Sequence, residues 1–168
     1  MASAGTGANR HLSGELFKMM AGVDMVHVPY RGTGPALTDL ISGQVQLIFD
    51  SVSTSIEYIR GGQLRALAVT TAARSELLPD IQSVAEFMPG YEASGWNGFG
   101  VPKNTPAEII HKLNREINAG LGDPKIKARL AELGGSILGG SPSDFGKLIP
   151  DETEKWGKVI KFAGIKAD

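Results

Sequence analysis

Residues 25–51 read MVHVPYRGTGPALTDLISGQVQLIFDS. Two apolar runs, at 25–30 and 45–50, have the composition of strands, and the segment between them opens with a glycine-rich turn and continues at helical spacing. Pro35 stands at an early helical position, and Gly43 follows the last apolar residue, where helices often end. The stretch predicts a strand, a helix and a second strand, the repeating unit of a parallel sheet.

The same alternation is found on both sides of this stretch. Residues 1–5 have the composition of a strand end, and apolar residues at helical spacing predict a helix over 9–21 that stops at Gly22. A short helix is expected at 51–62 and another strand at 64–70. Short connections between alternating strands and helices predict an α/β lobe with a parallel or mixed sheet flanked by helices.

The rest of the chain has a different pattern. Loop residues predominate after position 71, with a short helix expected near 83–87. Pro150 is expected to kink or break the last helix. The sequence further predicts a strand at 97–102, helices at 106–121, 124–134 and 143–163, and a short strand at 135–139.

Composition excludes several function classes. The chain has 168 residues, of which 42% are hydrophobic and 21% charged, a balance typical of a globular domain with its own core. The net charge is −1 without a basic stripe, which argues against nucleic acid as a partner. The absence of cysteine excludes disulfides, thiol catalysis and cysteine-based metal sites. No apolar run approaches the roughly 20 residues that a membrane-spanning helix needs.

Three polar turns each follow a predicted strand and precede a predicted helix. Two are rich in glycine, which frees backbone N–H groups, and the third combines a carboxylate with a hydroxyl group. Parallel strands end at one edge of a sheet, where open α/β sheets bind ligands, so we expect these turns to form half of a pocket for a small anion. The candidate ligand-binding residues are Ser3, Ala4, Gly5, Thr6, Gly7, Tyr30, Arg31, Gly32, Thr33, Gly34, Asp50 and Ser51.

Nucleotide binding is disfavoured at the first turn. The pattern GxxxxGK[ST] of a phosphate-binding loop is absent. Gly5 and Gly7 begin the dinucleotide pattern G-x-G-x-x-G, but Arg10 occupies the third glycine position, where its side chain disfavours close packing of helix on strand. The turn still presents N–H groups at a helix N-terminus, and these suit a carboxylate as well as a phosphate.

Each turn also has an ordinary structural explanation. Thr6 or Asn9 fits as the cap of the helix at 9–21, and Asp50 or Ser51 fits as the cap of the helix at 51–62. Arg31 could pair with a ligand carboxylate, or it could be an arginine on a surface turn. From spacing alone these alternatives stay open.

Signals for catalysis are weak. His11, His27 and His111 are expected to stand alone, with His27 packed within a strand and His111 on a solvated helix face. No serine-hydrolase elbow or zinc-protease pattern is present. Trp96 is expected at a domain junction or along a cleft, and Trp156 in the core. We expect no catalytic residue, no metal site and no cofactor.

The sequence resembles a known family over almost its whole length. Residues 3–51 look like the second lobe of Bug-type solute-binding proteins, the extracytoplasmic receptors of tripartite tricarboxylate transporters. The segments GFGVPKNTPAEIIHKLNREINAGL (98–121) and LAELGGSILGGSPSDFGKLIPDETEKWGKVIK (130–161) are similar to the closing part of that family. The resemblance implies a type II periplasmic-binding-protein fold that holds a carboxylate solute between two lobes and delivers it to a membrane permease.

Several further expectations depend on this resemblance. Family members bind their ligands through backbone amides, hydroxyl groups and bridging waters, which matches the three turns. Asp50 would then suit an amine, a hydroxyl or a water of the ligand site, because two carboxylates repel each other. The full-length protein is expected in the periplasm. Two rival functions stay open: a small α/β enzyme acting on a carboxylate or phosphate ester, and the effector-binding domain of a regulator.

The chain departs from the family in length. Family members are about twice as long, and the first lobe and the export signal are missing here, so we expect weak or no ligand binding. The expected division is a ligand-binding lobe at 1–96 and, at 97–168, a crossover strand with helices that would return to the absent lobe. The helices at 106–121 and 143–163 are therefore expected to expose apolar surface, which favours a homodimer or a domain swap.

Overall fold

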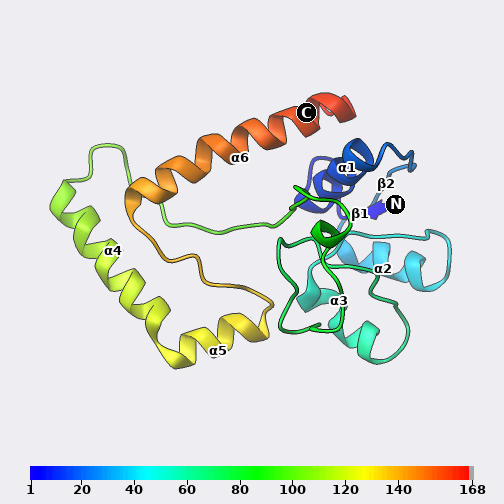
Figure 1. Cartoon of the computed structure of the whole chain (residues 1–168), viewed down its shortest axis with the longest axis horizontal. Helices are drawn as coiled ribbons and strands as arrows, with labels where there is room; N and C mark the ends of the chain where they lie inside the picture. The colour runs from blue at the N-terminus through cyan, green and yellow to red at the C-terminus, as the bar shows by residue number, and fades with distance from the viewer. Residues whose placement is uncertain (167–168) are drawn as a thin grey trace. The chain divides into compact units, whose positions relative to one another are not determined.

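The computed structural model describes residues 1–166, and its elements follow the predicted order of helices closely. A two-residue strand opens the chain, and helices make up most of the regular structure (Figure 1). In chain order the elements are β1 (Ala2–Ser3), α1 (Asn9–Ala21), β2 (Val28–Pro29), α2 (Thr33–Ile41), α3 (Val52–Arg60), a 3-10 turn η1 (Val84–Glu86), α4 (Ala107–Gly122), α5 (Pro124–Glu132) and α6 (Pro142–Ala163).

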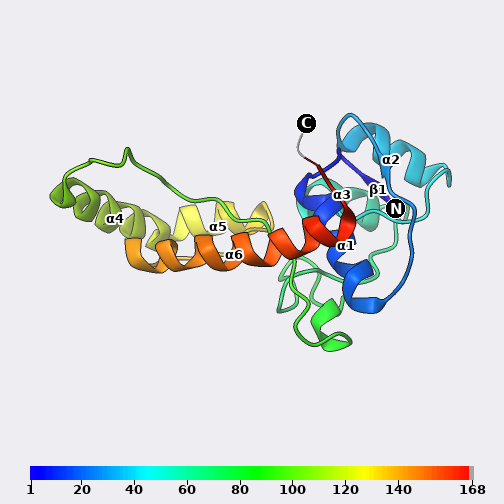
Figure 2. The same ribbon diagram turned by 90° about the horizontal axis from the view of Figure 1, so that it is seen from above.

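β1 is the middle strand of a small parallel sheet. It pairs with β2 in the register Ala2 to Val28, and Ala2 also forms a parallel bridge with Ile48 on the other side. The chain therefore runs from β1 through α1 to one neighbour, then through α2 to the opposite neighbour. Helices α1 and α2 lie on opposite sides of β1 in both views (Figures 1 and 2). This reversal of strand order creates a switch point at the end of β1.

The predicted α/β lobe is confirmed, but its sheet is shorter than expected. The run at 45–50 pairs only at Ile48, and the run at 64–70 only through a bridge from Val69 to Ser83. The predicted strands at 97–102 and 135–139 are wrong, because neither segment has a strand assignment. A strand is defined by ladder hydrogen bonds to a neighbouring strand, and neither segment pairs with another strand among residues 1–166.

The buried apolar residues form two clusters. One is built around Leu16 of α1 and the buried Tyr91, and Val159 of α6 is fully buried in it. Trp156 packs against this cluster, which agrees with its predicted place in the core. The other cluster is formed by Ala2, Ala36 and Val45, with partly buried neighbours from β2 and α2.

The chain divides into two compact units. The first combines Met1–Gly95 with the described residues from Lys155 onward, and the second is Trp96–Glu154. In the second unit α4 contacts α5, and Trp96 packs edge-to-face on Phe145, with ring centroids 5.4 Å apart. The predicted lobes at 1–96 and 97–168 stay a prediction, since that division refers to a partner lobe.

Helix α6 continues through Pro150 without a break. Proline removes one backbone donor and crowds the carbonyl four residues earlier. That residue is Gly146, which carries no side chain to add to the crowding. The predicted break is therefore absent, although the backbone hydrogen bond from position 150 is lost.

Exposed apolar side chains gather on the C-terminal helices, as predicted. In α4, Ile109 is 46% exposed and Leu113 is 42% exposed, and no residue of α4 or α5 is buried. Phe162 in α6 is 54% exposed. These helices are amphipathic. Their apolar faces are not buried by other described residues, as the exposure of these side chains shows.

Candidate functional site

Three helices begin at the edge of the sheet where the parallel segments end. Helix α1 follows β1, α2 follows β2, and α3 follows the segment that pairs at Ile48. A helix N-terminus carries unpaired N–H groups and a partial positive charge. The edge therefore gathers three positive helix ends around the switch point.

None of these three helix ends is capped by a side chain. The N-cap residues are Ala8, Gly32 and Ser51, and each lacks a side-chain hydrogen bond to the first turn. The caps expected from Thr6, Asn9, Asp50 or Ser51 are therefore wrong for this structure. The N–H groups of Thr33 and Gly34 also have no acceptor among residues 1–166.

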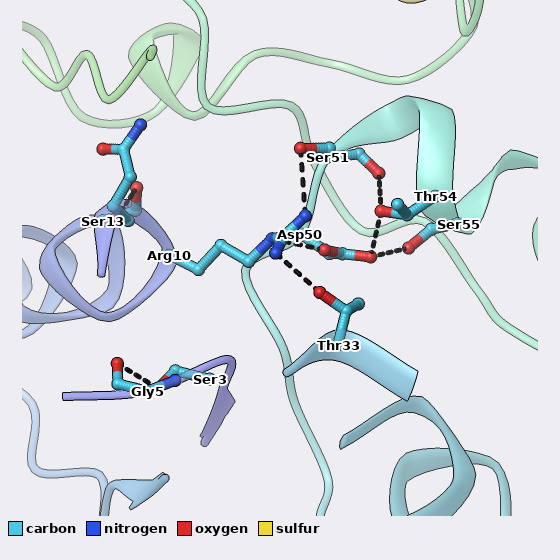
Figure 3. A network of polar contacts seen from close by, with 10 residues as sticks. Ser3, Gly5, Arg10, Ser13, Thr33, Asp50, Ser51, Thr54 and Ser55 are labelled. Carbon is cyan, nitrogen blue, oxygen red and sulfur yellow. Dashed lines mark hydrogen bonds and ion pairs between the residues drawn. The ribbon is translucent and has the colours of Figure 1, made fainter. Parts of the chain in front are cut away.

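Arg10 joins the starts of all three helices (Figure 3). It lies in the first turn of α1 and donates from Nη1 to the Thr33 hydroxyl at 2.6 Å and from Nη2 to the Ser51 hydroxyl at 3.3 Å. Its Nε lies 2.6 Å from Oδ1 of Asp50. Guanidinium carries five N–H donors in a fixed plane, and the two hydrogen bonds leave one N–H on each of Nη1 and Nη2, while the buried Nε has no hydrogen-bond partner among the described residues. The side chain is 25% exposed, which leaves these two N–H groups accessible in part.

Asp50 balances the charge of Arg10 and fixes its position. The Asp50 side chain is 3% exposed, and its second oxygen accepts hydrogen bonds from the hydroxyls of Thr54 at 2.7 Å and Ser55 at 2.6 Å. The carboxylate is thus held by two hydrogen bonds at this oxygen, while Oδ1 pairs with Arg10 as an ion pair and accepts no hydrogen bond from a described residue. Because the ion pair is neutral as a whole, the three helix ends leave the edge electrostatically favourable for an anion.

The predicted second turn divides into parts with different surroundings. The Tyr30 hydroxyl donates to Asp39 at 2.7 Å, and this hydrogen bond raises the pKa of Tyr30. Arg31 is exposed and forms no ion pair with a described residue. Gly32 has a φ of 107°, a conformation that side chains rarely adopt, and it sets the direction in which α2 begins. Thr33 is tied to Arg10.

Side chains of the chain itself accept hydrogen bonds from the backbone of the first turn, residues 3–7. The Gly7 N–H donates to Nδ1 of His11 at 3.0 Å, and the Gly5 N–H donates to the Ser3 hydroxyl at 3.2 Å. Ser3 is fully buried, Ala4 is half-buried and Thr6 is exposed. In this structure the amides of Gly5 and Gly7 are therefore occupied within the chain.

Two features of the candidate site region are not predicted by the sequence. The position of Arg10 departs from the dinucleotide pattern, and the signal that points to its role is a basic side chain directly after a glycine turn. His11 and His27 do not stand alone as predicted, because their rings stack with centroids 3.6 Å apart and planes 10° apart. They are 16 positions apart, and no helical or strand spacing links them.

Metal and membrane sites are not supported by the part of the chain that the structure describes. Within residues 1–166, no group of three or more histidine or acidic side chains is arranged to hold a metal ion. None of the helices in that range combines the length and the apolar character needed to cross a bilayer.

Comparison with protein families and relatives gives a consistent result. Residues 1–165 match the family described as tripartite tricarboxylate transporter family receptor. The UPF0065 protein in the tcbD-tcbE intergenic region of Pseudomonas sp. (strain P51) is 40% identical over 161 residues, which are 95% of this chain and 48% of that protein. The chain thus spans about half the length of this relative. The UPF0065 protein in the clcB-clcD intergenic region of Pseudomonas knackmussii is 37% identical, and the match covers 94% of both chains.

Solved structures show the same similarity. Rpa4515 of R. palustris with adipate superposes with a TM-score of 0.81 at 41% identity, over 98% of this chain and 55% of that one. The periplasmic binding protein BugD gives a TM-score of 0.77 at 34% identity, over 99% and 57% of the two chains. MatC (Rpa3494) from Rhodopseudomonas palustris with bound malate gives 0.72 at 30% identity, over 95% and 55%.

Proposed function

The chain belongs to the tripartite tricarboxylate transporter receptor family, and we propose that it is a ligand-binding lobe that captures a small dicarboxylate. The resemblance to Bug-type receptors is confirmed by the family match and by the similarity to BugD. One observation carries the proposal: the Arg10 side chain reaches the starts of α1, α2 and α3, and none of these helix ends has a side-chain cap.

In the proposed mode of binding, one carboxylate lies at the switch point. The uncapped N–H groups of Thr33 and Gly34 and the two remaining donors of Arg10 are its partners, with help from the Ser51 hydroxyl. Asp50 holds Arg10 in place and does not contact the carboxylate. Adipate and malate, the ligands named with two related structures, both carry two carboxylates.

The whole protein is proposed to work as a receptor of two lobes. In that account the second lobe supplies the other half of the cleft, and closure of the lobes around the solute produces the form that a membrane permease recognises. The full-length protein would then act in the periplasm. This chain alone keeps the α1, α2 and α3 side of the cleft, so its affinity is expected to be weak.

An enzymatic role finds less support. Ser3 of the first turn contacts a histidine outside the turns, His27, with the Oγ and Nε2 atoms 2.6 Å apart. Ser3 is fully buried and its hydroxyl donates to the Gly5 carbonyl, so a substrate cannot reach it. The family relationship likewise points to a receptor.

Binding by this chain should depend on the carboxylate charge. We expect adipate and malate to bind with an affinity on the order of millimolar, about −4 kcal/mol, because half of the contacts are retained. Ligand-observed NMR would detect this as line broadening that saturates, with the neutral diamide of adipic acid as control. Equal broadening by acid and diamide, or none by either acid, would rule the proposal out.

The exposed faces of α4 and α6 are proposed to drive self-association. Ile109, Leu113 and Phe162 are exposed in this chain, and burying them against a second copy would remove apolar surface from water. Sedimentation velocity should show a fraction of dimer that increases with protein concentration. The variant Leu113→Glu should shift the equilibrium toward monomer, whereas a monomer at every concentration of the unaltered chain would contradict the proposal.

A further inference from the structure

Two stacked imidazole rings, those of His11 and His27, contact the first turn. His11 comes from α1 and is 4% exposed, and His27 comes from the segment that leads into β2. The two rings are parallel within 10° at 3.6 Å. They also line an open cavity of about 900 Å³ together with Glu15 and Lys18. The role proposed above uses neither histidine.

Each imidazole holds one end of the turn at residues 3–7. Nδ1 of His11 accepts the N–H of Gly7, which places the ring proton of neutral His11 on Nε2. The Ser3 hydroxyl donates to the Gly5 carbonyl at 3.0 Å, so the contact with His27 is a donation from Nε2–H to Ser3 Oγ. The shape of the turn thus depends on two imidazoles in defined neutral tautomers.

The surroundings keep both rings neutral near pH 7. Burial lowers the pKa of His27 to about 4, with a further lowering by neighbouring His11. Burial also lowers the pKa of His11, against the opposing effect of the Glu15 carboxylate at 3.4 Å.

Other charged groups around the stack come from several elements. Besides Glu15, α1 contributes Lys18, whose Nζ lies 3.1 Å from Oε1 of Glu15. The Met1 ammonium group, directly before β1, lowers the pKa of His27. Asp24, from the segment after α1, and Lys166, which follows α6, line the same cavity.

We propose that the stacked pair His11 and His27 positions the turn at residues 3–7, which leads into α1 and Arg10 of the proposed site, and that protonation of His11 releases the Gly7 amide and loosens the turn. A proton on Nδ1 turns this acceptor into a donor that faces the Gly7 N–H. The turn then loses its tether, and part of the preorganised geometry at the end of β1 is lost. The effect on ligand affinity rests on the receptor function proposed above, whereas the effect on the turn does not.

The sign of the pH effect follows from the direction of the pKa changes. Both histidines have a lower pKa in the folded chain than their ordinary value of 6.5. The unfolded chain therefore binds more protons, and the folded form loses stability as pH falls below 6.5 toward the folded pKa values. The turn should be ordered above that range and released within it.

The first test uses the chain without ligand. In NMR spectra recorded from about pH 8 to about pH 4, the Gly7 amide signal should move with the same midpoint as the His11 ring signals, below 6.5. In His11→Asn the Oδ1 atom can still accept from Gly7 but does not titrate, so its Gly7 signal should show no transition at the His11 midpoint. The proposal is overturned if the Gly7 signal does not change as His11 titrates. It is also overturned if the Gly7 signal shifts with pH as much in His11→Asn as in the unaltered chain.

The second test measures adipate affinity at both ends of this pH range. The unaltered chain should lose about threefold more affinity on acidification than His11→Asn, because the variant reports the change that comes from protonation of adipate itself. An equal loss in the two proteins overturns the link to binding. If adipate binds to neither protein at any pH, the receptor function fails, while the result of the ligand-free titration still decides the role of His11.

Discussion

Replacing Asp50 with alanine is expected to lower the free energy of unfolding by about 3 kcal/mol. The Asp50 side chain is 3% exposed, and its loss leaves the guanidinium of Arg10 without its counter-ion at 2.6 Å. The hydroxyls of Thr54 and Ser55 lose their acceptor at the same time. The value is at the lower end for a broken buried pair because Arg10 is 25% exposed and regains some hydration.

Urea denaturation of matched variants would measure this effect. Glu57→Ala removes an exposed carboxylate that pairs with Arg60 on the surface of α3, and its stability should change little. The double variant Arg10→Leu with Asp50→Ala should recover part of the loss, because no unpaired charge is left. If Asp50→Ala lowers the free energy of unfolding no more than Glu57→Ala does, the ion pair does not organise the three helix starts.

Replacing Tyr91 with alanine should cost about 4 kcal/mol of stability. Tyr91 is 1% exposed and packs edge-to-face on Phe17 of α1, with ring centroids 6.1 Å apart. Its hydroxyl donates to the Ser13 carbonyl at 3.1 Å inside the core. The variant leaves a large cavity between α1 and the segment around residue 91, and the Ser13 carbonyl loses a hydrogen bond.

Two controls separate packing from hydrogen bonding at Tyr91. Tyr91→Phe keeps the ring and should cost about 1 kcal/mol, which is the net value of one buried hydrogen bond. Phe87→Ala removes an exposed aromatic ring from the neighbouring segment, and thermal unfolding should show little change. Equal losses for Tyr91→Ala and Phe87→Ala would mean that Tyr91 is not part of the core in solution.

Helices were predictable here because their signals are local. Apolar spacing and the position of Gly22 placed α1 correctly, and Pro124 opens α5 as expected at a first helical position. Strands depend on partners far along the chain, and composition alone does not supply these. The run at 45–50 therefore has strand composition, yet it pairs at Ile48 only.

The sheet edge that holds the candidate site was predictable from the sequence, but the contacts of Arg10 there were not. Glycine turns after strands pointed to the sheet edge, where α1, α2 and α3 begin. Arg10 joins these helices through Thr33 and Ser51, which lie 23 and 41 positions away, and no local pattern reports such contacts. The expected caps failed for a related reason, because Asp50 is engaged by Arg10 and Ser55 instead of the helix N-terminus.

The most direct test of the proposed carboxylate site is a map of backbone amide shifts during titration of this chain with adipate. The account predicts saturable shifts that cluster at the starts of α1, α2 and α3, led by Thr33, Gly34 and the Arg10 side-chain signals. The neutral diamide should leave these signals unchanged. Shifts spread evenly over the chain, or confined to α4 and α5, would contradict the site.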